Sequence, residues 1–479
     1  MCGKGVKPSR IGTFASLPAR QTADGRAYTG GLRWLVYVLT FTLTLIIRVR
    51  GISTHFWMLW DQIRDWGIAL GPFSDLPLVG PPTHFRGYTI GPAFYWILWG
   101  IRVTVGPWFD NLPHAGGIGQ ALLQSGADTL LLAAVWKRTQ SLAMALLTVV
   151  LLATSAFDLA LAPVVWNPMM GSILAKAATA LVLLDWPRRS LVRVGMVALL
   201  AWSAVHSYTG AVYVVLGVFA AMLAPFLVER HWREAVRRGA VIAGVVALLQ
   251  VPWAVHRLSR DGVPVMGVVT GSLAEVLTGR ASPRVGVSLR GYVEAFSFIQ
   301  GFPSSLPAAG WLLLAGAVLV AIRCRHDPAL LATLLIPQAL AIAGYALFQG
   351  GLDHYYYLSL MPAAVLTTVL AATALPDRWS FARSVVATVL LAAVLSQVPG
   401  RLSYSARMHR MHEYAPLVEG SRRTALRKQP MRSIETEFTM PSPSDPTFVY
   451  RILGGRIDPA SQWIARIRST GDVDYRRVD

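Results

Sequence analysis

The stretch that decides the fold is MLWDQIRDWGIALGPFSDLPLVGPPTHFRGYTIGPAFYWILWG, residues 58–100, which follows the first long apolar run of the chain. It places two aspartates on one short segment, continues through a passage rich in proline and glycine, and ends in an aromatic, helix-like piece. Whether its second half crosses the membrane or lies on it decides the side on which every later loop is placed.

The composition is that of an integral membrane protein. Hydrophobic residues make up 54% of the 479 residues and charged residues only 14%, whereas a soluble domain needs more charge to cover its surface. Apolar runs of roughly 17 to 20 residues, about the length that crosses a bilayer core, recur along the chain. The net charge of +19 is therefore attributed to loops on the inner side and to anionic lipids, and not to nucleic-acid binding.

Eleven of these runs are predicted membrane spans. They lie at residues 34–50, 118–136, 141–156, 169–185, 191–206, 210–227, 240–255, 308–322, 329–347, 358–374 and 384–399. Short basic connections such as Lys137-Arg138 and Arg188-Arg189 separate several of them. The positive-inside rule places these connections, and the basic tail at residues 1–33, in the cytoplasm.

The segment YTIGPAFYWILWGIRVTVG from Tyr88 conflicts with this topology if it is counted as a span, because every later basic loop would then lie outside. It contains Gly91 and Pro92 and has only a short uninterrupted apolar core. We therefore predict an interfacial or re-entrant helix on the external face. Residues 51–117 then form one large external loop.

The predicted architecture is an all-α polytopic membrane protein with about eleven transmembrane helices and external juxtamembrane helices. Its membrane domain covers residues 34–399, including a long external loop at 257–307. Residues 400–479 form a small, partly β extracytoplasmic domain, because FTMPSPSDPTFVYRILGGRI alternates like a strand and Gly454-Gly455 suggests a hairpin turn.

Acidic residues open the first external loop. If residues 61–66 are helical, Asp61 and Asp65 face the same way, one turn apart, with Arg64 beside them. Burial beside the tryptophans of this segment should raise the pKa of a carboxylate, and such a group could act as a general base. The alternative is an interfacial ion pair that caps and orients a helix.

Other polar residues are predicted to reach the same face. Arg86, near His84, could bind a phosphate or lipid headgroups. His206 lies at the outer end of a span, and His354 and Tyr355 precede another. Each alone is more often a satisfied interfacial residue, but their convergence on one face favours a shared site.

Two of the charges inside predicted spans need a separate account. Asp128 and Lys176 differ in depth by roughly 6 Å at a rise of 1.5 Å per residue, within reach of a lysine side chain. Because isolated charges at that depth are costly, we predict that they pair, with a structural role.

The sequence contains no phosphate-binding loop, HExxH zinc motif or serine nucleophile elbow. Energy for any reaction must therefore arrive with an activated substrate, which on the external face suggests a lipid-linked donor. No cofactor is expected, and no metal, because the first loop lacks a DxD pair.

These segments together resemble the GT-C glycosyltransferases, and more narrowly the bacterial relatives of the dolichyl-phosphate-mannose–protein mannosyltransferase family (glycosyltransferase family 39), which includes the lipid A aminoarabinose transferases. DQIRD and GPAFYW carry the resemblance most specifically, and WNP, VHSYTG and HYYYLSLMP are similar to recurrent segments of this group. The match places the family's essential aspartate on Asp61 and its following arginine on Arg64. The chain departs from the family at Gln62, where an acidic residue is usual, and at Thr89-Ile90, where the aminoarabinose enzymes have Glu-Lys.

The resemblance implies a polyprenyl-phosphate-linked sugar donor, a lipid, glycan or protein acceptor, and a location in the bacterial inner (plasma) membrane. Asp61 would deprotonate or orient the acceptor, which attacks the anomeric carbon with inversion, while the 257–307 loop covers the donor. The donor phosphate and sugar would be bound by Arg64, Asp65, His84, Arg86, His206, His354 and Tyr355.

Two other functions stay open from the sequence. A transporter or flippase would use mid-membrane charges, for which Asp128 and Lys176 are the evident candidates. A polymerase or ligase of lipid-linked glycans would place key arginines in a late external loop. Such arginines are Arg257, Arg260, Arg280, Arg284 and Arg290.

Overall fold

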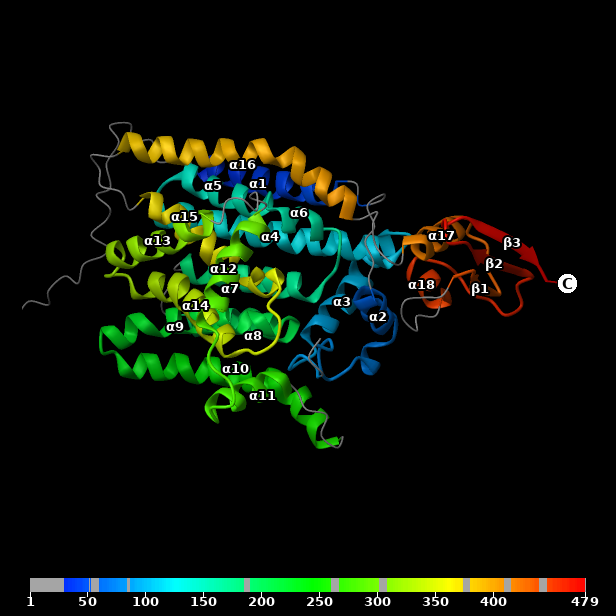
Figure 1. The fold of residues 1–479 in the computed structure, drawn as a ribbon, viewed down its shortest axis with the longest axis horizontal. Coiled ribbons are helices and arrows are strands. Elements are labelled where there is room, and N and C mark those ends of the chain that lie inside the picture. The colour runs from blue at the N-terminus through cyan, green and yellow to red at the C-terminus, as the bar shows by residue number, and fades with distance from the viewer. Residues whose placement is uncertain are drawn as a thin grey trace, which may run out of the picture.

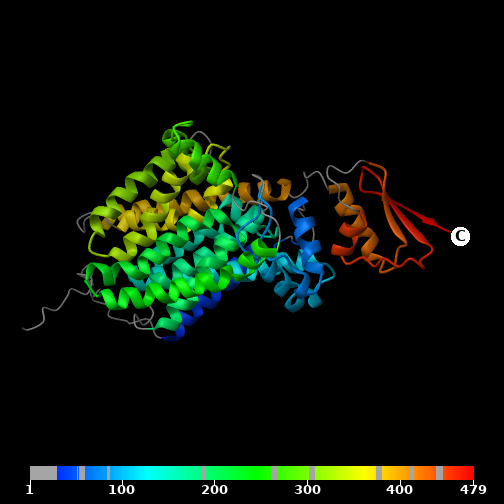
Figure 2. The same ribbon diagram turned by 90° about the horizontal axis from the view of Figure 1, so that it is seen from below.

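The structure is a computed structural model. It describes residues 30–50, 52, 60–83, 87–184, 190–259, 267–300, 308–373, 380–408, 415–438 and 446–478. Long helices run side by side in one bundle, and a small domain containing the three strands lies at one end of it (Figures 1 and 2). We call the end of the bundle next to this domain the site end.

A helix occupies most of each of the eleven predicted spans. Their bounds are α1 (Gly30–Val49), α4 (Leu112–Thr139), α5 (Leu142–Ala153), α7 (Asn167–Leu183), α8 (Leu191–Ser207), α9 (Val212–Val228), α10 (Trp232–Ser259), α13 (Ala308–Arg323), α14 (Pro328–Leu347), α15 (Met361–Thr373) and α16 (Ser380–Met408). Among the described residues, five helical segments, which include α1, α4, α9, α10 and α14, are long and apolar enough to cross a membrane. The chain is therefore a multi-pass membrane protein, and the count of eleven crossings stays a prediction.

The segment that begins at Tyr88 forms a short helix, as the charge pattern of the loops predicted. α3 (Ala93–Thr104) has 12 residues, which gives about 18 Å at 1.5 Å per residue, well short of a hydrocarbon core of about 30 Å. It starts after Pro92 and lies beside α2 (Trp60–Leu70) at the site end (Figure 1).

The region predicted as a long external loop is largely helical and partly packed. α11 (Gly267–Leu277) and α12 (Val285–Gln300) occupy much of it. Tyr292 of α12 is fully buried and donates a hydrogen bond to Gln338 Oε1 of α14 at 2.6 Å. α12 is thus part of the bundle and not a loose cover, because its buried face packs against neighbouring helices.

The C-terminal domain contains helices and a small sheet, which confirms its predicted partly β character. Its elements are α17 (Ala415–Leu426), β1 (Ser433–Thr436), α18 (Pro446–Ile452), β2 (Trp463–Ile467) and β3 (Val473–Arg477). β1 pairs with β2 in parallel, and β2 pairs with β3 antiparallel.

The predicted hairpin turn at Gly454-Gly455 is wrong. The preceding residues form α18, and Gly454 follows its end with a φ of +87°. The N–H of Gly454 donates to the Arg451 carbonyl at 3.1 Å, and that of Gly455 donates to the Tyr450 carbonyl at 2.9 Å. The two glycines therefore close the C-terminus of a helix, where a left-handed residue satisfies the last carbonyls.

Candidate functional site

The predicted acidic site lies on α2, at the site end of the bundle. Arg64 Nη1 lies 2.9 Å from Asp61 Oδ1, and Arg64 Nε donates to Asp65 Oδ1 at 2.8 Å. One guanidinium therefore bridges two carboxylates on successive turns of the helix. This confirms the helical arrangement expected from the spacing of the three residues.

The two carboxylates differ in their access to solvent. The side chain of Asp61 is 32% exposed, whereas that of Asp65 is 2% exposed. The Tyr95 hydroxyl of α3 donates to Asp65 Oδ1 at 3.1 Å, and Asp65 Oδ2 has no hydrogen-bond partner among the described residues. Burial raises the pKa of Asp65 to about 7, although the charge of Arg64 opposes this rise. Asp61 is thus the more exposed of the two carboxylates, and Asp65 contacts Arg64 from the buried side.

Asp65 should make the stability of the protein depend on pH. Its pKa in the folded protein, about 7, lies above the ordinary value of 3.8. Between these two values the folded state keeps a proton that the unfolded state releases, so this group lowers stability as the pH rises from about 4 to 7. We expect Asp65→Asn to flatten the fall in thermal unfolding temperature between about pH 5 and 7, measured in detergent.

The exposed Asp75 of η1 (Phe73–Asp75) offers a matched control for this measurement. Asp75→Asn should keep the pH dependence of the wild type, because its carboxylate is in water in both states. Equal slopes in the wild type and Asp65→Asn would contradict the role given to Asp65.

Aromatic rings of η4 (His354–Leu360) pack against one another and against Trp166. The ring of Tyr355 lies 5.0 Å from that of Trp166, between ring centroids, and 4.6 Å from that of Tyr356. Burial, chiefly, raises the pKa of the Tyr355 phenol, and the charge of Asp61 contributes to the rise. The charge of Asp61 thus acts on the Tyr355 phenol, and both stay predicted site residues.

The two predicted histidines have different surroundings. His206 is 0% exposed, and Gly91 of the first loop packs on its ring so closely that a Cβ at Gly91 would lie 2.1 Å from Nδ1. A donor could reach this ring only if Gly91 moved away. His354 is partly buried and stacks on Phe298 of α12, with ring centroids 4.4 Å apart. His354 therefore stays a candidate ligand, whereas His206 in this structure supports the loop above it.

The passage between α2 and α3 is described only in part. The predicted phosphate ligands His84 and Arg86 lie outside the described residues. Thr89, where the resembled family has a charged pair, is 2% exposed, and its hydroxyl donates to the Pro81 carbonyl at 2.8 Å. Thr89 is thus buried and closes the loop through its own backbone.

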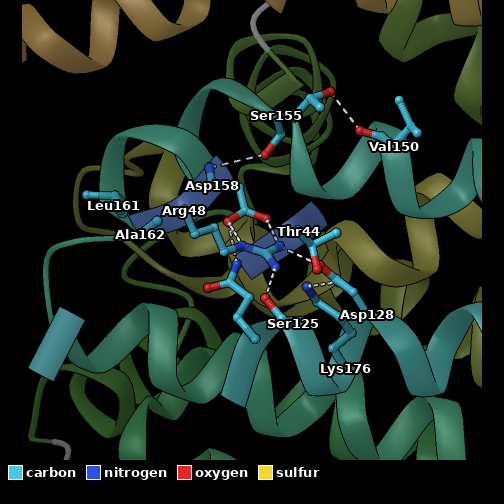
Figure 3. Close-up of polar contacts among 12 residues, drawn as sticks. Thr44, Arg48, Ser125, Asp128, Val150, Ser155, Asp158, Leu161, Ala162 and Lys176 are labelled. Atoms are coloured by element: carbon cyan, nitrogen blue, oxygen red, sulfur yellow. Dashed lines mark hydrogen bonds and ion pairs between the residues drawn. The ribbon is translucent and has the colours of Figure 1, made fainter. Parts of the chain in front are cut away.

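A second polar cluster lies inside the bundle, and the sequence predicted half of it (Figure 3). Lys176 Nζ lies 2.6 Å from Asp128 Oδ1, which confirms the predicted pair. Arg48 of α1 also pairs with Asp128. With Nε and Nη2 it bonds both oxygens of Asp158, at 3.0 and 2.7 Å.

These four charges balance one another. Their side chains are at most 5% exposed, and Ser125 and Gln124 add hydrogen bonds to the arginine and to Asp158 at 3.0 and 2.6 Å. Asp158 lies on α6 (Ala156–Leu161), a short helix capped by Ser155 after α5 ends at Ala153. The sequence signal that could have revealed the rest of the cluster is Arg48, because a charge inside the first predicted span needs a buried partner.

No protein-family model matches the sequence, and no curated protein matches it either. Among solved structures, apo ArnT from Cupriavidus metallidurans is similar at 15% identity and a TM-score of 0.52, over 88% of this chain and 85% of that one. ArnT of the same organism bound to undecaprenyl phosphate gives 15% identity and a TM-score of 0.49, over 89% and 85%. The archaeal oligosaccharyltransferase AglB from Archaeoglobus fulgidus is similar at 12% identity and a TM-score of 0.43, over 82% of this chain and 58% of that one. The likeness to apo ArnT extends over most of both chains, and the protein therefore has the GT-C fold of that glycosyltransferase.

Proposed function

We propose that the protein is a membrane glycosyltransferase that moves a sugar from a polyprenyl-phosphate-linked donor to an acceptor at the external face of the plasma membrane. The observation that carries the proposal is the Asp61–Arg64–Asp65 group on a short helix at one end of a bundle with the GT-C fold. Asp61 keeps a partly exposed carboxylate there, and its charge acts on the phenol of the partly buried Tyr355. A lipid-linked donor suits a site at the membrane surface in a sequence without a phosphate-binding loop for ATP.

The site end is proposed to face the outside. The connection between α9 and α10, with the basic residues Arg230 and Arg233 in and beside it, lies at the opposite end of the bundle (Figure 1). Since short basic connections stay in the cytoplasm, this placement supports an external site. With eleven crossings, the amino-terminal tail would be cytoplasmic and the C-terminal domain extracytoplasmic.

In the proposed reaction, Asp61 accepts a proton from an acceptor hydroxyl or amine. The acceptor atom forms a bond to the anomeric carbon, the bond from this carbon to the phosphate oxygen breaks, and the polyprenyl phosphate leaves with the electron pair. Because attack comes from the face opposite the leaving group, the configuration inverts. Arg64 orients the Asp61 carboxylate, and Asp65 holds Arg64 from the buried side.

The remaining predicted residues would bind the donor. Tyr355, whose ring packs with that of Trp166, offers an aromatic surface for the sugar. His84, Arg86 and His354 stay proposed ligands of the leaving phosphate, where charge develops during the reaction.

The structure gives less support to a transporter. A transport site needs charges that a substrate or ion can engage, but Asp128 and Lys176 are neutralised by Arg48 and Asp158. All four side chains are enclosed within the bundle. This compensation is what a structural cluster requires.

A polymerase or ligase is also less supported, because two arginines of the 257–307 region have local partners; Arg260 lies outside the described residues. Arg284 donates to the Gln349 and Gly350 carbonyls at 3.3 and 3.4 Å, and Arg290 pairs with Glu294 at 2.7 Å. These contacts occupy both guanidinium groups with neighbouring residues.

The donor can be tested directly through the lipids that the protein retains. After gentle purification, mass spectrometry of the extracted lipids should find polyprenyl phosphate, free or sugar-linked, because the donor enters from the bilayer. An unrelated polytopic protein purified from the same membranes is the control. Identical lipids in the two preparations, followed by no transfer from polyprenyl-phosphate sugars in proteoliposomes, would contradict the proposed function.

A further inference from the structure

Two contacts hold α2, the helix that carries Asp61, and in each of them an aromatic ring lies on a glycine. Trp66 of α2, 1% exposed, lies on Gly116 of α4, where a Cβ would be 2.2 Å from the indole Cζ2 atom. Phe448 of α18 lies on Gly67 of α2, where a Cβ would be 1.5 Å from the ring Cζ atom. Since side-chain Cβ atoms essentially never come within 3.0 Å of a neighbour, any larger residue would displace the ring. The first contact joins α2 to the membrane bundle, and the second joins it to the C-terminal domain.

The C-terminal domain meets the bundle at a second close contact. Gly454, just beyond α18, approaches the connection before α4, where a Cβ at this residue would lie 1.9 Å from the Asp110 carbonyl oxygen. Its φ of +87° also requires a glycine. Phe448 and Gly454 therefore hold α18 near both of its ends. Two such contacts give the C-terminal domain a defined position against α2 and the bundle.

We propose that Phe448 is a positioning residue for the reaction at Asp61, and that the C-terminal domain sets the place of α2 against the bundle. This inference rests on the proposed function. Gly67 follows Arg64 by three residues, so the ring presses on the side of the helix that carries the guanidinium. Tyr355 and Trp166 belong to the bundle, and a shift of α2 would move Asp61 relative to them.

The expected size of the effect follows from the geometry of catalysis. Misplacing a reacting group by about 1 Å can cost roughly 100-fold in rate, whereas binding of the donor elsewhere is unchanged. Phe448 touches no reacting atom in this scheme. Its loss should therefore lower kcat and leave the KM for the donor near that of the wild type.

A size-exchange experiment in the full-length protein tests the inference. Gly67→Ala should lower kcat by about 10- to 100-fold, because the methyl group and the ring cannot occupy the same space. Phe448→Ala should lower kcat several-fold, because α2 loses one support. The double variant should regain much of the rate lost in Gly67→Ala, because the methyl group then fits where the ring was. Phe448→Leu, which keeps an apolar side chain, should lie between Phe448→Ala and the wild type.

Gly100→Ala on the neighbouring α3 is the matched control, because a Cβ there meets nothing within 4 Å. It should keep the kcat of the wild type. If the double variant is as slow as Gly67→Ala, or if Phe448→Ala has the wild-type kcat, the positioning role is overturned.

A readout without sugar transfer separates this inference from the proposed function. The changes in unfolding temperature caused by Gly67→Ala and Phe448→Ala should not add up in the double variant, since the two residues share one contact. Additive changes in unfolding temperature would overturn the docking of the C-terminal domain on α2. Non-additive unfolding together with a wild type that transfers no sugar would support the docking and overturn only the proposed function.

Discussion

Asp61→Asn should abolish sugar transfer while the protein stays folded and inserted in the membrane. The amide cannot accept the acceptor proton, and loss of a general base costs about 100- to 10,000-fold in rate. The side chain is partly exposed and its contact to Arg64 lies at the surface of the helix, so the substitution should leave the packing of α2 intact. Initial rates in proteoliposomes supplied with a polyprenyl-phosphate sugar measure the effect.

The exposed Asp75 provides the comparison for this variant as well. Asp75→Asn lies in the same loop and removes the same charge, and it should transfer sugar at the rate of the wild type. Size-exclusion profiles and unfolding temperatures should be alike for all three proteins. Near-normal turnover by Asp61→Asn would remove this residue from the role of base.

Arg48→Met should be strongly destabilising. The substitution leaves two buried carboxylates with Lys176 as the one cation remaining in the four-charge cluster. Removing one partner of a buried ion pair costs about 3–5 kcal/mol, because the other charge stays buried and uncompensated. The yield of monodisperse protein and its unfolding temperature in detergent should both fall.

Arg50→Met is the matched control, because Arg50 follows the end of α1 and is exposed. It should behave as the wild type. Arg48→Met combined with Asp158→Asn should recover part of the loss, since the Asp128–Lys176 pair is then balanced. Equal stability of Arg48→Met and Arg50→Met would contradict the structural role of the cluster.

The long helices and the short helix α3 could be predicted because a bilayer imposes a strong constraint on a linear sequence. Apolar length marks a candidate crossing, and the charges of the loops favoured a short helix over a span at α3. α18 and α12 were harder, because short segments with mixed polarity fit a strand, a loop or a helix. Their packing against segments distant in the sequence decides their secondary structure, and the local sequence does not show which segments these are.

The candidate site shows the same division. Asp61, Arg64 and Asp65 are neighbours on one helix, so their spacing predicted their contacts. Asp128 and Lys176 were matched because an isolated charge in a membrane is costly. Asp158 was missed because it followed a predicted span, where a charge needs no partner. The contact between Phe448 and Gly67 could not be predicted, since nothing near a glycine in the sequence shows which distant ring it must accommodate.

The position of Arg48 bears on the order in which the protein is assembled. α1 presents much of its surface to lipid, with Trp34 68% exposed and Leu43 63% exposed. The carboxylates that neutralise Arg48 follow it by 80 and 110 residues. While the chain is being synthesised, α1 is therefore in the bilayer before those partners exist, and its guanidinium has to reach the headgroup layer to stay hydrated. The contacts of Arg48 with Asp128 and Asp158 can therefore form only after α4 and α6 have been synthesised, so the first helix completes its packing late.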